Sequence, residues 1–271
     1  MSTPGTHVLS HADQAPGGTV LRSSRGIALR GLRAIVRLPS AFFPAMMMPI
    51  FQAIAFSGTF FAITKIPGFP TDRSINWFLP LAAVMGSGFS GVGVGFTTIR
   101  DLESGFFDRL RMAPVPRTAL VIGPLLAVWV RTLLVLAAVT VVGVLFGARL
   151  TGGPMALLTL AAAGLGTATI GAGWSLGLAY RFRDMRAAAL MQLGLFNAIF
   201  LTNAQAPLNV MTGWLHAVAK VNPFTNILRL GRQGFLGDVT WDGSWGGLVA
   251  IAVLTALAWL FAQTGLRRLD A

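Results

Sequence analysis

Residues able to carry acid–base, metal or nucleophilic chemistry are few and widely spaced in this 271-residue chain. It has no cysteine, which excludes disulfides, zinc–thiolate sites and cysteine nucleophiles. Its three histidines are His7, His11 and His216, so no metal site and no acid–base cluster is evident. The nine acidic residues all lie outside the long apolar segments. The sequence therefore lacks the buried carboxylates of an ion-coupled transporter, and any energy for transport must come from outside the chain.

Arg131 is the single charged residue within an apolar segment. A charge at the bilayer centre costs ~2.5–3.5 kcal/mol on insertion scales, which makes Arg131 a functional candidate by default. The alternative is that the span starts at about Thr132 and leaves Arg131 at the inner interface. The 17 residues from there to Ala148 are at the lower limit for crossing a bilayer. Both interpretations stay open at this point.

A second group of charges lies in residues 99–117, IRDLESGFFDRLRMAPVPR, which hold three of the nine acids. Leu102, Phe106 and Leu110 recur at helical spacing between the charges. Pro114 and Pro116 would then end the helix. About 20 residues exceed the usual connection between helices. The pattern predicts a short, charged, aromatic-bearing helix that could dock a soluble motor domain, and a plain polar turn is the alternative.

The elements that would hold these residues are six apolar segments. Hydrophobic residues make up 54% of the chain, charged residues 11%, and mean hydropathy is +0.69, far from a soluble protein. Each segment gives at least ~25 Å of helix. The predicted fold is an all-α integral membrane protein with six transmembrane helices, in one domain over residues 40–268. The predicted spans are 40–64, 76–98, 119–146, 154–180, 187–203 and 244–266.

The N-terminal region has two parts. Residues 1–18 are rich in Gly, Pro, Ser and Thr and are predicted to be disordered. Residues 19–39 place five arginines within one arc of about 140° on a helical wheel. This pattern predicts an amphipathic helix lying on the membrane surface, with an ordinary basic flank as the alternative. The five arginines are Arg22, Arg25, Arg30, Arg33 and Arg37.

The distribution of Lys and Arg predicts the orientation. One side of the six spans would hold 14 of the 21 basic residues and the other side 6, with Arg131 between them. The richer side should be cytoplasmic, so both termini are predicted to be cytoplasmic. Trp77, Trp241 and Trp245 would then lie at the outer membrane edges. The net charge of +12 is placed to meet lipid headgroups, so no nucleic-acid partner is expected.

Residues 204–242 are too long for an unstructured outer loop and are interrupted by proline and glycine. Asn222 followed by Pro223 predicts a helix start, and Gly237 predicts its end. We therefore expect a re-entrant or surface-lying helical hairpin between spans five and six, with a loosely folded outer loop as the alternative.

Glycines crowd the second and fourth spans. Gly91 and Gly95 have GxxxG spacing, and Gly173 and Gly177 repeat it. Small residues let helix backbones approach closely, so these faces are predicted to pack inside the bundle. A moving, low-friction surface used in gating is the alternative.

Two stretches resemble the ABC-2 type permease family, in particular its daunorubicin-resistance-like drug and lipid exporter branch. The first is residues 100–117, with an arginine, an acid two residues before a glycine, a short apolar run and a P-V-x-R ending. The second is residues 211–225 and 232–237, similar to the family's outer hairpin and its N-P-x-T helix, here Asn222, Pro223 and Thr225. The resemblance extends over about residues 20–268.

This resemblance implies a permease subunit of an exporter in the bacterial cytoplasmic membrane. Two permeases, identical or paired with a sister chain, would dock two separate ABC ATPase subunits that bind ATP and Mg. The substrate would be a hydrophobic or amphipathic drug, lipid or glycolipid. The residues implied in ATPase coupling are Arg100, Asp101, Glu103, Gly105, Phe107, Asp108, Arg109 and Pro114.

One observation independent of the resemblance agrees with it. The chain has no GxxxxGK[ST] phosphate loop, so it is expected to bind no cofactor and not to hydrolyse ATP itself. A secondary multidrug transporter is the alternative function, but it would be expected to bury Asp, Glu or His along an ion path. A membrane-embedded enzyme would need the polar cluster that the sequence lacks.

Overall fold

The structure, a computed structural model, describes residues 24–26, 28–29, 39–106 and 119–270. Every regular element within these ranges is helical, which confirms the all-α prediction. Four of the described helices are long and apolar enough to cross a membrane. They are α3 (Ser74–Glu103), α5 (Ala119–Leu145), α6 (Pro154–Phe182) and α10 (Trp241–Asp270).

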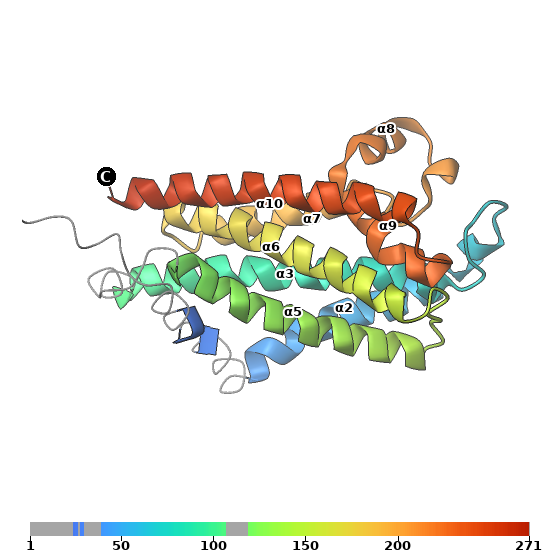
Figure 1. The fold of residues 1–271 in the computed structure, drawn as a ribbon, viewed down its shortest axis with the longest axis horizontal. Helices are drawn as coiled ribbons and strands as arrows, with labels where there is room; N and C mark the ends of the chain where they lie inside the picture. Colours follow the sequence, from blue (N-terminus) through green and yellow to red (C-terminus); the bar gives the residue numbers. More distant parts are fainter. Residues whose placement is uncertain (1–23, 27, 30–38, 107–118, 271) are drawn as a thin grey trace, which may run out of the picture.

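Helix α3 is the central element of the bundle. It has 30 residues, which corresponds to ~45 Å of helix. Almost every side chain from Ser74 to Gly95 is buried, because α3 contacts α2, α5, α6, α7 and α9. Figure 1 shows it running between α5 on one side and α6 and α10 on the other. Helix α3 begins two residues before the predicted span of residues 76–98 and ends five residues after it.

Two of the six predicted spans are not among these four helices. Helix α2 (Pro39–Thr59) ends before the predicted boundary at residue 64, and a 3₁₀ helix, η1 (Phe61–Lys65), follows it. Ser57, Gly58 and Thr59 are weak helix formers, which accounts for the earlier end. Helix α7 (Ala187–Phe200) has 14 residues, or ~21 Å, less than the ~30 Å hydrocarbon core. The number of six crossings therefore stays a prediction.

Residues 204–242 contain the expected pair of helices, after a short 3₁₀ turn, η2 (Leu208–Val210). Helix α8 (Gly213–Val221) precedes α9 (Pro223–Leu236). The Asn222 side chain accepts a hydrogen bond from the Phe224 backbone N at 2.9 Å, and Gly237 follows the last helical residue. Helix α9 packs against α3, α6 and α10. How deeply this hairpin enters a membrane stays a prediction.

The bundle has two distinct ends. Figure 1 shows the last turns of α3, α6 and α10 at one end, together with the C-terminus, and η1, α8 and α9 at the other. We refer to them as the inner end and the outer end, following the charge bias of the sequence. The predicted tail 1–18 and all but a few residues of the predicted interfacial helix 19–39 lie outside the described residues.

Candidate functional site

The inner end of α3 carries the first candidate residues. The helix continues through Asp101 to Glu103, whereas the sequence predicts that residues 99–117 form a segment separate from the span. It ends because Gly105 has a left-handed φ of 64°, a conformation that glycine adopts without strain. Arg100 and Glu103 are exposed in the last turn. These charges are therefore rigidly joined to the most buried helix of the bundle.

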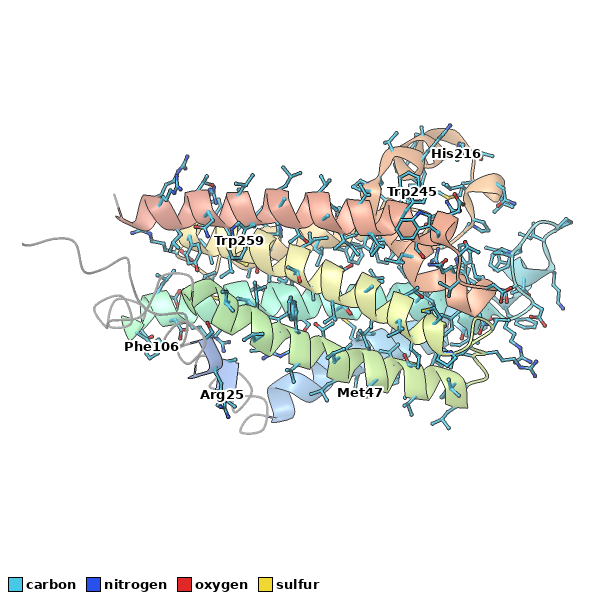
Figure 2. The ribbon with its side chains drawn as sticks, viewed as in Figure 1. Arg25, Met47, Phe106, His216, Trp245 and Trp259 are labelled. Atoms are coloured by element: carbon cyan, nitrogen blue, oxygen red, sulfur yellow. The ribbon has the colours of Figure 1, made fainter. Side chains whose placement is uncertain are left out.

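The remaining predicted coupling residues, Phe107, Asp108, Arg109 and Pro114, lie outside the described part of the chain. Phe106 is the last described residue before them. Figure 2 shows Phe106 and His216 at opposite ends of the molecule, so the predicted coupling segment starts at the end remote from the outer hairpin.

Arg131 lies inside α5, twelve residues after its first residue, Ala119. The depth of Arg131 in a membrane stays a prediction, because a helix can begin outside the bilayer. Its side chain is partly buried against α3, because a Cβ added to Gly93 would lie 3.3 Å from the Arg131 Nη1 atom. Two residues before it, the Trp129 indole Nε1 donates to the Thr169 hydroxyl of α6 at 3.0 Å.

The outer end is held by a second arginine, which sequence reasoning missed. Arg232 of α9 is 1% exposed. Its guanidinium donates to the Trp77 carbonyl (3.1 Å), the Asn203 carbonyl (2.8 Å) and the Ala204 carbonyl (2.6 Å). Burial lowers the pKa of Arg232 to about 9, so the group still carries its proton at neutral pH. These bonds tie α9 to the start of α3 and to the segment after α7.

The ring of Trp77 stacks against the guanidinium of Arg232. The guanidinium carbon lies 3.8 Å from the centroid of the Trp77 ring, a cation–π distance. The Trp77 indole Nε1 also donates to the Ala204 carbonyl at 3.2 Å. Trp77, predicted at the outer membrane edge, lies in the first turn of α3 at the outer end of the bundle and is 3% exposed. It therefore packs inside the protein, and its depth in a membrane stays a prediction. Trp241 and Trp245 are exposed.

A buried amide extends the same polar network. The Asn76 Nδ2 donates to the carbonyls of Phe235 (2.7 Å) and Arg149 (3.2 Å), and its Oδ1 accepts from the Arg149 backbone N (2.9 Å). On α9, the Gln233 amide donates to the Ser244 hydroxyl at 2.8 Å. The feature of the sequence that could have indicated the packing of α9 is its pair of glycines, Gly231 and Gly234, on either side of Arg232. Both glycines meet α6, at Ala163 and Ala156.

The four predicted packing glycines lie at two different helix interfaces. A Cβ at Gly91 would overlap the Ala168 carbonyl oxygen of α6, and one at Gly95 would lie 2.6 Å from the Ser175 Cβ. Gly173 and Gly177 instead face α10, at Ala258 and at the Phe261 ring. The GxxxG pairs therefore do not pack against each other, but each pair removes side chains from a close helix contact.

Asn222 and Thr225 have structural partners in the hairpin. The Asn222 Nδ2 donates to the carbonyls of Ala198 and Leu201, both at 2.8 Å, and the Thr225 hydroxyl donates to the Ala219 carbonyl at 2.6 Å. These bonds join α8 and α9 to the end of α7, with Pro223 occupying the first helical position between them. No group of three or more His, Cys, Asp or Glu that could hold a metal occurs among the described residues.

The bundle has four long apolar helices, exposed charges at its inner end and a buried polar network at its outer end. These features are typical of a multi-pass helical membrane protein. The comparisons with known proteins narrow this class. Residues 25–236 match the ABC-2 type transporter family, and the chain belongs to that family, whose members are membrane subunits of ABC transporters and work with an ABC ATPase.

Two relatives illustrate the membership. The chain is 25% identical over 267 residues to the daunorubicin resistance ABC transporter permease protein DrrB1 of Streptomyces coeruleorubidus, covering 96% of this chain and 90% of the relative. It is 23% identical over 249 residues to the putative transport permease ycf38 of Pyropia yezoensis, covering 88% and 79%. The ABC-2 resemblance and its drug-exporter branch are thus confirmed.

Proposed function

We propose that this chain is the transmembrane subunit of an ABC exporter that moves a hydrophobic or amphipathic substrate outward across the bacterial cytoplasmic membrane. In this proposal the chain crosses six times, with both termini cytoplasmic and with α8 and α9 as a re-entrant hairpin. Separate ATPase subunits, which bind ATP and Mg, dock on residues 99–117. A second permease copy or a sister permease completes the pore. The drug-resistance name of one relative supports an amphipathic drug or lipid as substrate.

The continuity of α3 is the observation that carries the proposal. One unbroken helix joins the exposed charges Arg100 and Glu103 to Asn76 and Trp77 in the outer network. Because its side chains are buried against five other helices, a displacement imposed at the inner end cannot be absorbed locally. Packed interfaces move as units rather than deforming continuously. Closure of the ATPase subunits would therefore be transmitted along α3 to the outer end.

The surface of the bundle agrees with a lipid-embedded subunit that has room for a partner. Helices α5 and α10 expose many large apolar side chains within the described part of the chain. Among them are Leu133, Leu134, Val141, Val253, Leu257 and Leu260. Such faces are stable against lipid tails or against another apolar helix.

The test uses the chain co-expressed with its ATPase, reconstituted in proteoliposomes. ATP-driven movement of daunorubicin and of a fluorescently labelled phospholipid is measured in parallel with ATP hydrolysis. Removing charge with Glu103→Ala and Asp101→Ala should lower transport several-fold and uncouple it from hydrolysis, while chain yield stays unchanged. Asp72→Ala is the matched control, because Asp72 is an exposed acid in the segment between η1 and α3.

Two results would contradict the proposal. Normal ATP-driven export by the Glu103→Ala, Asp101→Ala double variant would remove the coupling role of this helix end. Transport that needs a proton gradient and continues without ATP would favour the secondary multidrug transporter instead.

A further inference from the structure

We propose that the inner ends of α6 and α10 bind one anionic phospholipid, with its phosphate on an arginine cluster and an acyl chain in the groove between α5 and α10. The arginine cluster consists of Arg183, the residue after α6, and of Arg267 and Arg268 in the last turn of α10. The Arg183 Nη2 donates to the Arg268 carbonyl at 3.4 Å, so the two helix ends meet at the cluster. The lipid is a resident ligand and not the transported substrate, so its binding does not depend on the transport function proposed above.

The two helix ends bring arginines together without matching acids. Residues 181–186 and 267–270 contain five arginines and two aspartates. Asp184 forms an ion pair with Arg186 at 3.4 Å. The three residues of the arginine cluster are exposed, and none forms an ion pair with an acid in the part of the chain that the structure describes. Like charges held close together repel one another, and a phosphate bound between them removes this repulsion.

Arg181 fixes the ends of α6 and α10 relative to each other. Its Nη1 donates to the carbonyls of Gly177 (2.7 Å) and Phe261 (2.8 Å), and its Nη2 donates to the Thr264 hydroxyl at 2.7 Å. Its guanidinium carbon lies 3.8 Å from the centroid of the Phe261 ring. Gly265 lets the helices approach closely, because a Cβ there would lie 2.8 Å from the Arg181 Nη1. The arginine cluster is therefore held on a rigid support, which lowers the cost of ordering it around a ligand.

The surroundings of the arginine cluster are apolar and exposed. Phe182 and Met185 lie between the arginines that follow the end of α6 and are 52% and 38% exposed. On α10, Leu257 and Leu260 are exposed two to three turns before the cluster. In a bilayer, arginines at the end of a span reach the headgroups while the apolar side chains beside them contact acyl chains. This arrangement favours an amphiphile over a purely polar anion or an acidic protein surface.

A groove lies between α5 and α10, toward the inner end of the bundle. Both helices contact α6, but their backbones do not approach each other in the described residues. The groove between them has a volume of about 260 Å³. Its lining is mainly apolar and consists of Leu125 of α5, Thr169, Gly173 and Leu176 of α6, and Thr255, Trp259 and Ala262 of α10.

The spacing of the groove and the arginine cluster fits a phospholipid. Leu176 precedes Arg183 by seven residues, which corresponds to ~10 Å along a helix. The headgroup layer on each side of a bilayer is about 5–8 Å thick. A lipid with its phosphate on the arginine cluster would therefore have the first part of an acyl chain at the level of the groove.

The site is tested with the full-length permease in maltoside micelles, without ATPase or ATP. Binding of palmitoyl-oleoyl phosphatidylglycerol is measured by native mass spectrometry beside phosphatidylcholine with the same chains. We expect phosphatidylglycerol to bind at least about tenfold more tightly, because choline cancels the charge of the phosphate. The double variant Arg267→Gln, Arg268→Gln should lose this preference. The control Arg149→Gln, Lys220→Gln removes the same charge from two exposed positions at the outer end and should keep it.

The groove is tested separately from the headgroup contact. Thr255→Phe places a ring in the groove and should weaken binding of both lipids several-fold. Val253→Phe is the matched control, because Val253 is 52% exposed on the same helix and does not line the groove. Dihexanoyl phosphatidylglycerol, which has the same headgroup on short chains, should bind the unmodified protein at least about tenfold more weakly, and this comparison needs no variant.

Three results would overturn the proposal. The first is equal affinity for phosphatidylglycerol and phosphatidylcholine, or a preference retained within twofold by the Arg267→Gln, Arg268→Gln variant. The second is equal affinity of the Thr255→Phe and Val253→Phe proteins together with tight binding of the short-chain lipid. The third is normal phosphatidylglycerol binding by the arginine variant with loss of co-purification with the ATPase, which would assign the arginine cluster to the ATPase interface.

Discussion

Arg232 offers the sharpest test of how the outer end of the bundle is held together. The perturbation is Arg232→Met, which keeps an apolar stem of similar length and removes the guanidinium. Three hydrogen bonds to carbonyls of Trp77, Asn203 and Ala204 are lost. At about 1.5 kcal/mol for each charged donor, the lost bonds amount to about 4–5 kcal/mol. Loss of the stack on the Trp77 ring adds about 1 kcal/mol.

Part of this loss is recovered. Arg232 is a fully buried charge without a carboxylate partner in the described residues, so removing it also removes a desolvation penalty of about 2–3 kcal/mol. The Ala204 carbonyl keeps its bond from the Trp77 indole. The net expectation is a loss of about 3 kcal/mol. For a chain of this size that corresponds to a fall of about 6–12 °C in the melting temperature.

The assay is heat-induced unfolding in detergent, followed by tryptophan fluorescence and by the fraction that elutes as a single species. Arg229→Met is the matched control on the same helix, because Arg229 is exposed and makes only a surface ion pair with Asp242. That pair is worth less than about 1 kcal/mol, so its melting temperature should change little. Arg232→Lys should lie between the two, since an ammonium cannot reach three carbonyls and also stack on Trp77. Equal melting temperatures for Arg232→Met and Arg229→Met would refute the assignment of Arg232 as the residue that fastens α9 to α3.

Two further predictions concern packing and topology. Gly91→Ala would set a Cβ into the Ala168 carbonyl and within 2.9 Å of the Ala172 N, both backbone atoms. It should therefore lower the free energy of unfolding by at least about 2 kcal/mol and lower the yield of folded protein. Gly58→Ala is the control, because its Cβ meets open space; equal yields and melting temperatures for the two variants would contradict the close α3–α6 contact. Because the chain has no native cysteine, Asp72→Cys and Thr240→Cys should react with a membrane-impermeant maleimide in intact cells and Ser104→Cys should not; labelling of Ser104→Cys from outside would reverse the proposed orientation.

The sequence predicted the helical elements well because their signals are local. Long apolar runs specify α3, α5, α6 and α10, and the Asn222–Pro223 pair marks the start of α9. The sequence predicted the ends of these helices less well, since each end depends on single residues. Ser57–Thr59 end α2 early, while Gly105 allows α3 to continue to Glu103 before it breaks. The crossing count was inferred from apolarity alone, and α7 shows that an apolar run need not be a full-length helix.

The surroundings of the buried polar residues could not be predicted from the sequence, because they depend on contacts between distant parts of the chain. Trp77 and Arg232 are 155 positions apart in the chain, and each alone looks like an interfacial residue. Their contact depends on where α9 packs, which no local pattern specifies. The glycines at 231 and 234 could have indicated a close helix contact, but not that the arginine between them contacts the start of α3.

Arg131 and Arg232 show why position in the sequence is a poor guide to the environment of a charged residue in this protein. By sequence, Arg131 was the intramembrane charge and Arg232 an outer-loop charge. In the structure Arg232 is buried and Arg131 is half-buried, and their surroundings differ. Arg232 is enclosed by three backbone carbonyls and an indole ring and is 1% exposed, so a substrate cannot approach it. Arg131 is half-buried, and its guanidinium lies close to Gly93 of α3. The first arrangement satisfies the charge of Arg232 within the outer end of the fold, whereas the second places the Arg131 guanidinium at a close contact between two long apolar helices.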